Sequence, residues 1–134
     1  MKLYKYITIL FFLFGTTIYA QKFNFKATNV SVLEPAGKGK PAKWTKPTPT
    51  ELIISLDYDK DKIVIYSSEI QHYKILEYLP KEVTKVDEIN SFICRNHEGI
   101  AVKIAIILRL DVKKAQLYVY HKDFTFAYDI LEME

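Results

Sequence analysis

The chain has 134 residues, which suits a single domain, and a formal net charge of only +3. Two of its lysines lie in an apolar leader, so residues 21–134 carry 17 basic and 16 acidic side chains. This near-neutral balance excludes a nucleic-acid or membrane-surface function that would rest on overall positive charge. The single cysteine, Cys94, excludes an internal disulfide.

Residues 1–20 have the pattern of a secretory signal peptide. Lys2 and Lys5 precede an almost entirely apolar run, and Ala20 offers the small residue that signal peptidase requires. The uncharged stretch of 15 residues is shorter than the ~20 that span a bilayer as a helix. No cysteine follows the apolar run, so a lipoprotein anchor is excluded. We therefore predict cleavage after Ala20, no stable membrane anchor, and a mature chain, residues 21–134, that is periplasmic or secreted.

Alternation of apolar and polar residues dominates the mature chain and predicts strands rather than helices. The clearest run is 100–110, in which every second residue is isoleucine, valine or leucine. Six further segments are predicted as strands because they are rich in β-branched and aromatic residues. They are 22–32, 51–58, 62–67, 70–78, 115–120 and 124–131. Residues 80–92 suit either a short helix or a polar crossover loop. The prediction is one all-β domain of seven or eight antiparallel strands in meander order, closed as a small barrel or folded as a sandwich.

Three aspartates, Asp57, Asp59 and Asp61, have the spacing with which calcium-binding loops begin. Such a loop needs glycine at its sixth position and a bidentate glutamate at its twelfth, where this chain has Lys62 and Ser68. The aspartates are therefore interpreted as a hairpin turn, in which their side chains bond backbone amides. Two further turns are predicted at 96–99 and 121–123.

Residues 35–49 are rich in proline, glycine and lysine and predict a mobile loop within the β domain. The loop belongs to a basic segment, 22–46, with six lysines and one glutamate. This segment is either a solvated loop over an acidic body or a docking strip for an anionic partner. Trp44, inside the loop, is interpreted as a lid over one end of the core or, less often, as a partner contact.

Motifs of catalysis are scarce. The chain has no G-x-S-x-G elbow and no P-loop, and its three histidines, His72, His97 and His121, have no metal-ligand spacing. We therefore predict neither an enzyme nor a metal or cofactor site. Cys94 lies in an apolar run and is interpreted as a buried thiol, with a reactive thiol as the alternative.

Several segments together resemble small, signal-peptide-bearing exported bacterial proteins, which mostly lack an assigned activity. The segments are Trp44 before the first strong strand, ELIISL and KIVIYS as a hairpin, Gln71-His72-Tyr73, and the closing LYVY and FAYDI pair. A tryptophan followed by an up-and-down run of strands is also similar to lipocalin-like barrels. That family has glycine two residues before its tryptophan, where this chain has Ala42.

The leading functional hypothesis is a non-catalytic exported domain that binds a partner through aromatic side chains and the basic loop. Exposed tyrosines are favoured at interfaces and stack on sugars or peptides. The candidate binding residues are Trp44, Tyr118, Tyr120, Lys38, Lys40 and Lys43. The expected partner is a protein, a glycan or a small apolar ligand, and no nucleic acid. The alternatives are a lipocalin-like carrier of a small apolar molecule and, more remotely, a small hydrolase.

Overall fold

The computed structural model describes residues 22–35 and 39–133. The predicted signal peptide and the candidate residue Lys38 lie outside these described residues. The strands are β1 (Lys22–Glu34), β2 (Lys43–Trp44), β3 (Thr48–Asp57), β4 (Lys62–Tyr66), β5 (Ile70–Tyr78), β6 (Glu82–Val83), β7 (Asp87–Asn96), β8 (Ala101–Arg109), β9 (Lys114–Tyr120) and β10 (Thr125–Glu132). Among the described residues, no helix is long and apolar enough to cross a membrane.

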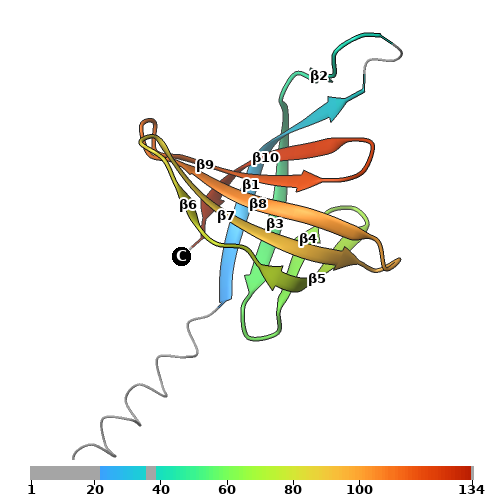
Figure 1. Cartoon of the computed structure of the whole chain (residues 1–134), viewed down its shortest axis with the longest axis vertical. Helices are drawn as coiled ribbons and strands as arrows, with labels where there is room; N and C mark the ends of the chain where they lie inside the picture. The colour runs from blue at the N-terminus through green and yellow to red at the C-terminus, as the bar shows by residue number, and fades with distance from the viewer. Residues whose placement is uncertain (1–21, 36–38, 134) are drawn as a thin grey trace, which may run out of the picture.

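Eight of the strands close into an antiparallel barrel (Figure 1). Their order is β10-β9-β8-β7-β5-β4-β3-β1, and β1 pairs with β10 to complete the ring. The two short strands are additions, because β2 pairs with β1 and β6 pairs with β7. The predicted all-β meander is confirmed, and of the two predicted architectures the structure has the barrel rather than the sandwich.

Alternation along each strand fills the barrel with apolar side chains. In the middle of the barrel, Ile54, Ile63, Ile65, Ile104, Leu117, Val119 and Cys94 are almost completely buried. The predicted burial of Cys94 is confirmed, and burial raises the pKa of its thiol to about 12. The centre of the barrel is therefore a packed core, and space for a ligand lies at the two ends.

The sequence of residues 80–92 suited either a short helix or a crossover loop, and the structure instead has two strands here. Glu82–Val83 is the short strand β6, and β7 begins at Asp87. The first residues of β7 lack apolar alternation, but β8 pairs with them continuously from Asp87↔Arg109 to Arg95↔Ala101. The partner strand thus imposes an extended conformation that the local sequence does not specify.

The three predicted turns are confirmed. The Asp57 carboxylate accepts hydrogen bonds from the backbone N–H groups of Asp59 and Lys60, both at 3.1 Å. Asn96 does the same at the β7–β8 turn, where Gly99 has a φ of 83° that favours glycine. At the third turn, the His121 N–H donates to the Phe124 carbonyl at 2.9 Å. The aspartates at 57–61 thus act as turn residues.

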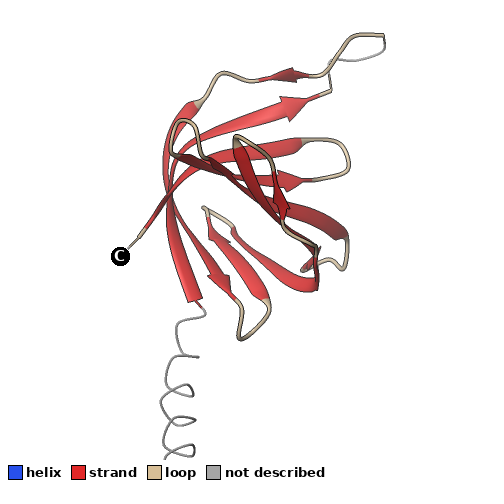
Figure 2. Cartoon of the chain, turned by 60° about the vertical axis from the view of Figure 1, so that its left-hand side comes forward, coloured by secondary structure: helices blue, strands red, loops and turns tan. Residues whose placement is uncertain are grey.

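The predicted loop at 35–49 is shorter in the structure. Lys43 and Trp44 form β2, and Thr48 already belongs to β3. Pro49 is tolerated in β3 because it pairs only with β1, at Asn29, before β4 joins on the other side at Ile53. The long β1–β3 ends that carry β2 extend beyond the neighbouring strands (Figure 2).

Candidate functional site

Three predicted binding residues come together on the outside of the barrel, and we call Trp44, Tyr118 and Tyr120 the aromatic face. The rings of Trp44 and Tyr118 meet edge to face, with centroids 5.9 Å apart, and Tyr120 lies 5.9 Å from Tyr118. Tyr118 and Tyr120 point outward, because their strand neighbours Leu117 and Val119 point into the core, and Trp44 lies against Tyr118 on the same outer side. Trp44 nevertheless remains 46% exposed and Tyr120 37% exposed.

The aromatic face lies over small outward-facing residues. Two strands, β1 and β10, separate Trp44 on β2 from Tyr118 on β9. On β10, Ala127 is opposite Tyr118 and Thr125 is opposite Tyr120, and both are less than 10% exposed. Ala105 on β8 is similarly buried on the outer surface. Small side chains at these positions leave room for the large rings to meet across the sheet.

Lysines flank the aromatic face. The Lys103 ammonium lies 5.8 Å from the centre of the Tyr120 ring, a cation–π distance. Lys43 is next to Trp44 on β2, and Lys40 is exposed in the preceding loop. The structure thus brings the three predicted aromatic residues to one region and adds Lys103, which the sequence analysis did not single out. Lys43 follows the alternation of β2 and points to the opposite face from Trp44.

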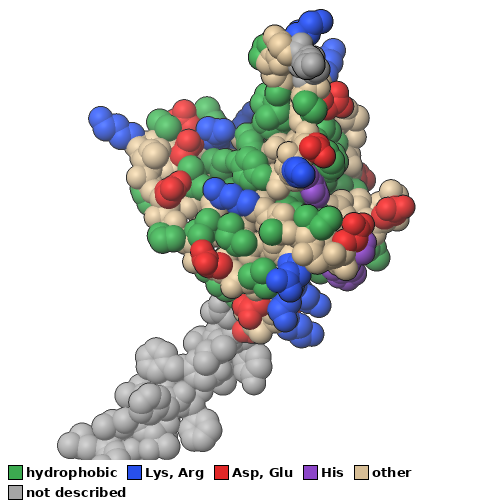
Figure 3. Space-filling model, turned by 45° about the vertical axis from the view of Figure 1, so that its right-hand side comes forward, with side chains coloured by type: hydrophobic (Ala, Val, Ile, Leu, Met, Phe, Trp, Pro, Cys, Tyr) green, Lys and Arg blue, Asp and Glu red, His purple; other side chains and the backbone are tan. Residues whose placement is uncertain are grey.

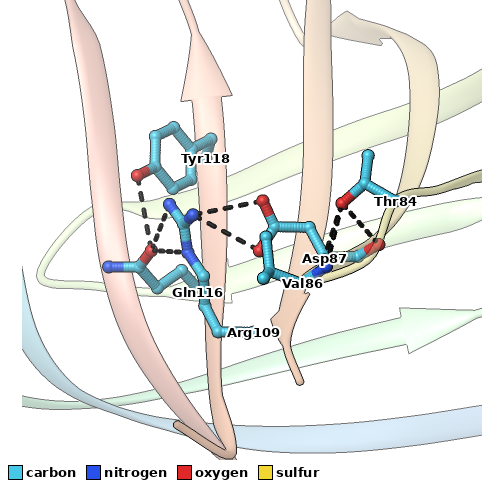
Figure 4. Close-up of polar contacts among 6 residues, drawn as sticks. All are labelled: Thr84, Val86, Asp87, Arg109, Gln116 and Tyr118. Carbon is cyan, nitrogen blue, oxygen red and sulfur yellow. Dashed lines mark hydrogen bonds and ion pairs between the residues drawn. The ribbon is translucent and has the colours of Figure 1, made fainter. Parts of the chain in front are cut away.

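A polar network holds Tyr118 from the side (Figure 4). Arg109 donates to both Asp87 carboxylate oxygens at 3.3 and 3.4 Å and to the Gln116 amide oxygen. The same Gln116 oxygen accepts from the Tyr118 hydroxyl at 3.4 Å, while the Gln116 amide nitrogen donates to Asp129 at 3.0 Å. These contacts cross four strands and connect the Tyr118 hydroxyl to the barrel.

A second feature is a pocket of about 540 Å³ at one end of the barrel, which we call the mouth pocket. The β4–β5, β7–β8 and β9–β10 turns surround it. On the turn-bearing side of the molecule, histidine side chains lie close to acidic ones (Figure 3). Tyr73 and Gln71 on β5 face Phe124 and Phe126 across the opening. A pocket of this volume is within the usual range for a small-molecule site.

All three histidines line the mouth pocket, although the sequence scatters them. The ring of His121 lies 4.6 Å from that of Phe124, and its Nε2 atom is buried without a hydrogen-bond partner. Burial lowers the pKa of His121, so the imidazole is neutral near pH 7. In the described part of the chain, no three histidine, cysteine or carboxylate groups are placed to share a metal ion.

The hydrolase alternative required histidines and carboxylates in one cleft, and His72, His97 and Glu98 do line the same pocket. Two serines, Ser67 and Ser68, also line the pocket, and Ser67 donates its hydroxyl to the Glu69 carbonyl and accepts from Gln71. A catalytic serine needs a base within hydrogen-bonding reach, and Ser67 has other partners. The geometry therefore gives the hydrolase alternative a set of residues, but Ser67 is not bonded to a base in this pocket.

Trp44 was interpreted first as a lid over one end of the core, and this interpretation is wrong. Its ring lies against Tyr118 on the outside of the barrel, half exposed, because β2 pairs with the outer end of β1. The mouth pocket was missed altogether. Its signal was the polar residues Gln71 and Asn96, which continue the inward register of the core residues Tyr73 and Cys94 at the ends of their strands.

The described residues thus define a closed, eight-stranded antiparallel barrel with an aromatic outer face and a pocket at one mouth. In comparisons with family models, curated proteins and solved structures, nothing matches this chain.

Proposed function

We propose that this protein is an exported, non-catalytic binding domain and that its aromatic face binds an acidic polysaccharide. The observation that carries the proposal is the edge-to-face contact of Trp44 with Tyr118, which gathers large aromatic rings on a surface that stays open to solvent. Tryptophan and tyrosine supply most of the binding energy at many recognition surfaces.

The chemistry of the aromatic face favours a partner with both apolar ring faces and negative charge. An aromatic ring offers an apolar, polarizable surface on which the C–H-rich face of a sugar can pack. Lys103 stands beside the Tyr120 ring and offers an ammonium group to a carboxylate. An acidic polysaccharide combines both features in each repeat.

The polar network behind Tyr118 supports binding by pre-organisation. Gln116 is held between Arg109 and Asp129, and its amide oxygen accepts the Tyr118 hydroxyl. A ring that is already fixed loses less conformational freedom when a partner binds. The barrel therefore acts as the rigid scaffold for this surface.

The experiment is retention on immobilised alginate, a carboxylate-bearing polysaccharide, with dextran as the neutral comparison. Changing Trp44, Tyr118 and Tyr120 together to alanine is expected to abolish retention on alginate, because truncating a cluster of central aromatic contacts commonly costs about 2 kcal/mol or more per residue. Higher salt is expected to weaken wild-type binding, because the lysine contribution is screened.

The matched control is an aromatic residue elsewhere on the outer surface. Tyr66 on β4 is 47% exposed and far from β9 in the strand order, so Tyr66→Ala should be retained like the wild type. Equal retention of the triple variant and the wild type would contradict the proposal, as would a preference for dextran.

A carrier of a small apolar molecule is the second candidate, favoured by the mouth pocket. The packed centre of the barrel, with Ile104 and Val119 completely buried, leaves this function only the pockets at the ends. Native and denaturing mass spectra of the exported protein, taken side by side, would test it. Extra mass in the native spectrum alone would support a retained ligand, and equal masses would count against a carrier.

A further inference from the structure

We propose that the mouth pocket is a binding site for a small organic cation, such as a primary amine, separate from the aromatic face. This inference does not depend on the proposed polysaccharide function. It rests on the charge, the hydrogen-bonding capacity and the aromatic walls of the pocket.

The charge of the mouth pocket has the opposite sign to that of the chain. The full sequence has 19 lysines and arginines against 16 aspartates and glutamates. The residues that line the pocket include Glu69 and Glu98 but no lysine or arginine. Neither carboxylate is paired with a lysine or arginine of the lining, and Glu98 lies 3.7 Å from His97 Nε2, which carries a charge only when protonated. The lining therefore favours a positively charged ligand. His121 adds no opposing charge near pH 7, because burial lowers its pKa.

Three polar side chains of the pocket, Tyr73, Gln71 and Ser67, donate their hydrogens along one chain of bonds. The Tyr73 hydroxyl donates to the Gln71 amide oxygen at 2.6 Å. The Gln71 amide nitrogen donates to the Ser67 hydroxyl at 3.0 Å, and Ser67 in turn donates to the Glu69 carbonyl. These internal bonds use up hydroxyl donors and leave lone pairs on the Tyr73 oxygen. Together with the Glu69 and Glu98 carboxylates, these lone pairs suit an ammonium group, which has three donors and no acceptor.

Aromatic rings form the side of the pocket that faces these acceptors. Phe124 and Phe126 lie with their centroids 5.1 Å apart in an edge-to-face arrangement, and Phe124 is 38% exposed. The face of an aromatic ring attracts a cation through its quadrupole, and the rings also accept the apolar body of an organic amine. Acceptors on β5 and rings at the start of the β10 hairpin arm, Phe124 in the turn and Phe126 on β10, thus enclose the two chemically different parts of one ligand.

The test uses three probes of nearly the same shape: cyclohexylamine, cyclohexanol and cyclohexanecarboxylate. Each is titrated into the isotopically labelled protein, and backbone amide shifts are followed by NMR. We expect saturable shifts centred on Gln71, Asn96 and Phe124 with the amine, weaker shifts with the alcohol, and none there with the carboxylate. Equal responses to all three probes, or the strongest response to the carboxylate, would overturn the proposal.

Variants locate the site and separate it from the aromatic face. Changing Glu69 and Glu98 together to glutamine should weaken amine binding several-fold, because both pocket carboxylates are lost. The matched control, Glu51→Gln with Glu82→Gln, removes two exposed carboxylates outside the pocket lining and should leave the affinity unchanged. The Trp44, Tyr118 and Tyr120 triple variant should also bind the amine normally, so failure of the polysaccharide proposal would leave this one standing. Unchanged amine affinity after loss of both pocket carboxylates would overturn it.

Discussion

Replacing Ile104 with alanine is expected to lower the free energy of unfolding by about 2–5 kcal/mol. Ile104 lies in the middle of β8, opposite Phe92 and Val119, with no exposed surface. Alanine would leave a cavity that eight closed strands cannot readily collapse, because each strand is held on both sides. Equilibrium unfolding in urea, followed by circular dichroism, measures the change.

Two further substitutions make the test of the core specific. Ile104→Val removes one methylene and should cost about 0.5–1.5 kcal/mol. The control is Ile70→Ala, the same chemical change on β5 at a position that is 52% exposed, where we expect less than about 1 kcal/mol. Similar losses at positions 70 and 104 would contradict the packed centre of the barrel.

The second large effect is a loss of stability at alkaline pH. Burial raises the pKa of Cys94 from 9.0 to about 12 and is the main cause that raises the pKa of Tyr73 from 10.0 to about 12. The folded state therefore keeps these protons at pH values where the unfolded state has lost them. Below about pH 9 both states hold these protons, and the free energy of unfolding is unaffected. As the pH rises from 9 toward 12, the free energy of unfolding falls progressively.

The expected slope is about 1.4 kcal/mol per pH unit for each group that is ionised only in the unfolded state. Urea unfolding curves measured between about pH 8 and pH 11 should show the free energy of unfolding falling, first from Cys94 and then also from Tyr73. Cys94→Val should remove the part of the slope that begins near pH 9. A free energy of unfolding that stays level or rises over this range would contradict the buried, protonated thiol.

Much of the fold follows from alternation in the sequence. The run from Ile100 to Leu110 predicts β8 because every second residue needs a buried face, and the other predicted strands follow the same rule. The start of β7 could not be predicted this way, because Asp87 and Glu88 do not alternate with apolar residues in the sequence. Their strand conformation comes from pairing with β8, where Arg109 also binds Asp87.

The candidate sites were predictable to different degrees. The sequence picked out Trp44, Tyr118 and Tyr120 by residue type, but the contact between Trp44 and Tyr118 depends on β1 and β10 closing the ring. The mouth pocket needs three turns, far apart in the chain, to meet at one end of the barrel. No local pattern encodes that meeting, although a polar residue in the inward register, such as Gln71, is a partial signal.

The most direct test of the binding surface uses its own tryptophan, because Trp44 is the only tryptophan in the chain. Its fluorescence should therefore report on the aromatic face alone. Titrating a protein of residues 21–134 with alginate oligosaccharides is expected to give a saturable blue shift or change in intensity, as Trp44, now 46% exposed, is shielded from water. Dextran oligosaccharides should give none. If calorimetry detects alginate binding while the Trp44 emission stays unchanged, the binding surface lies elsewhere and the account is wrong.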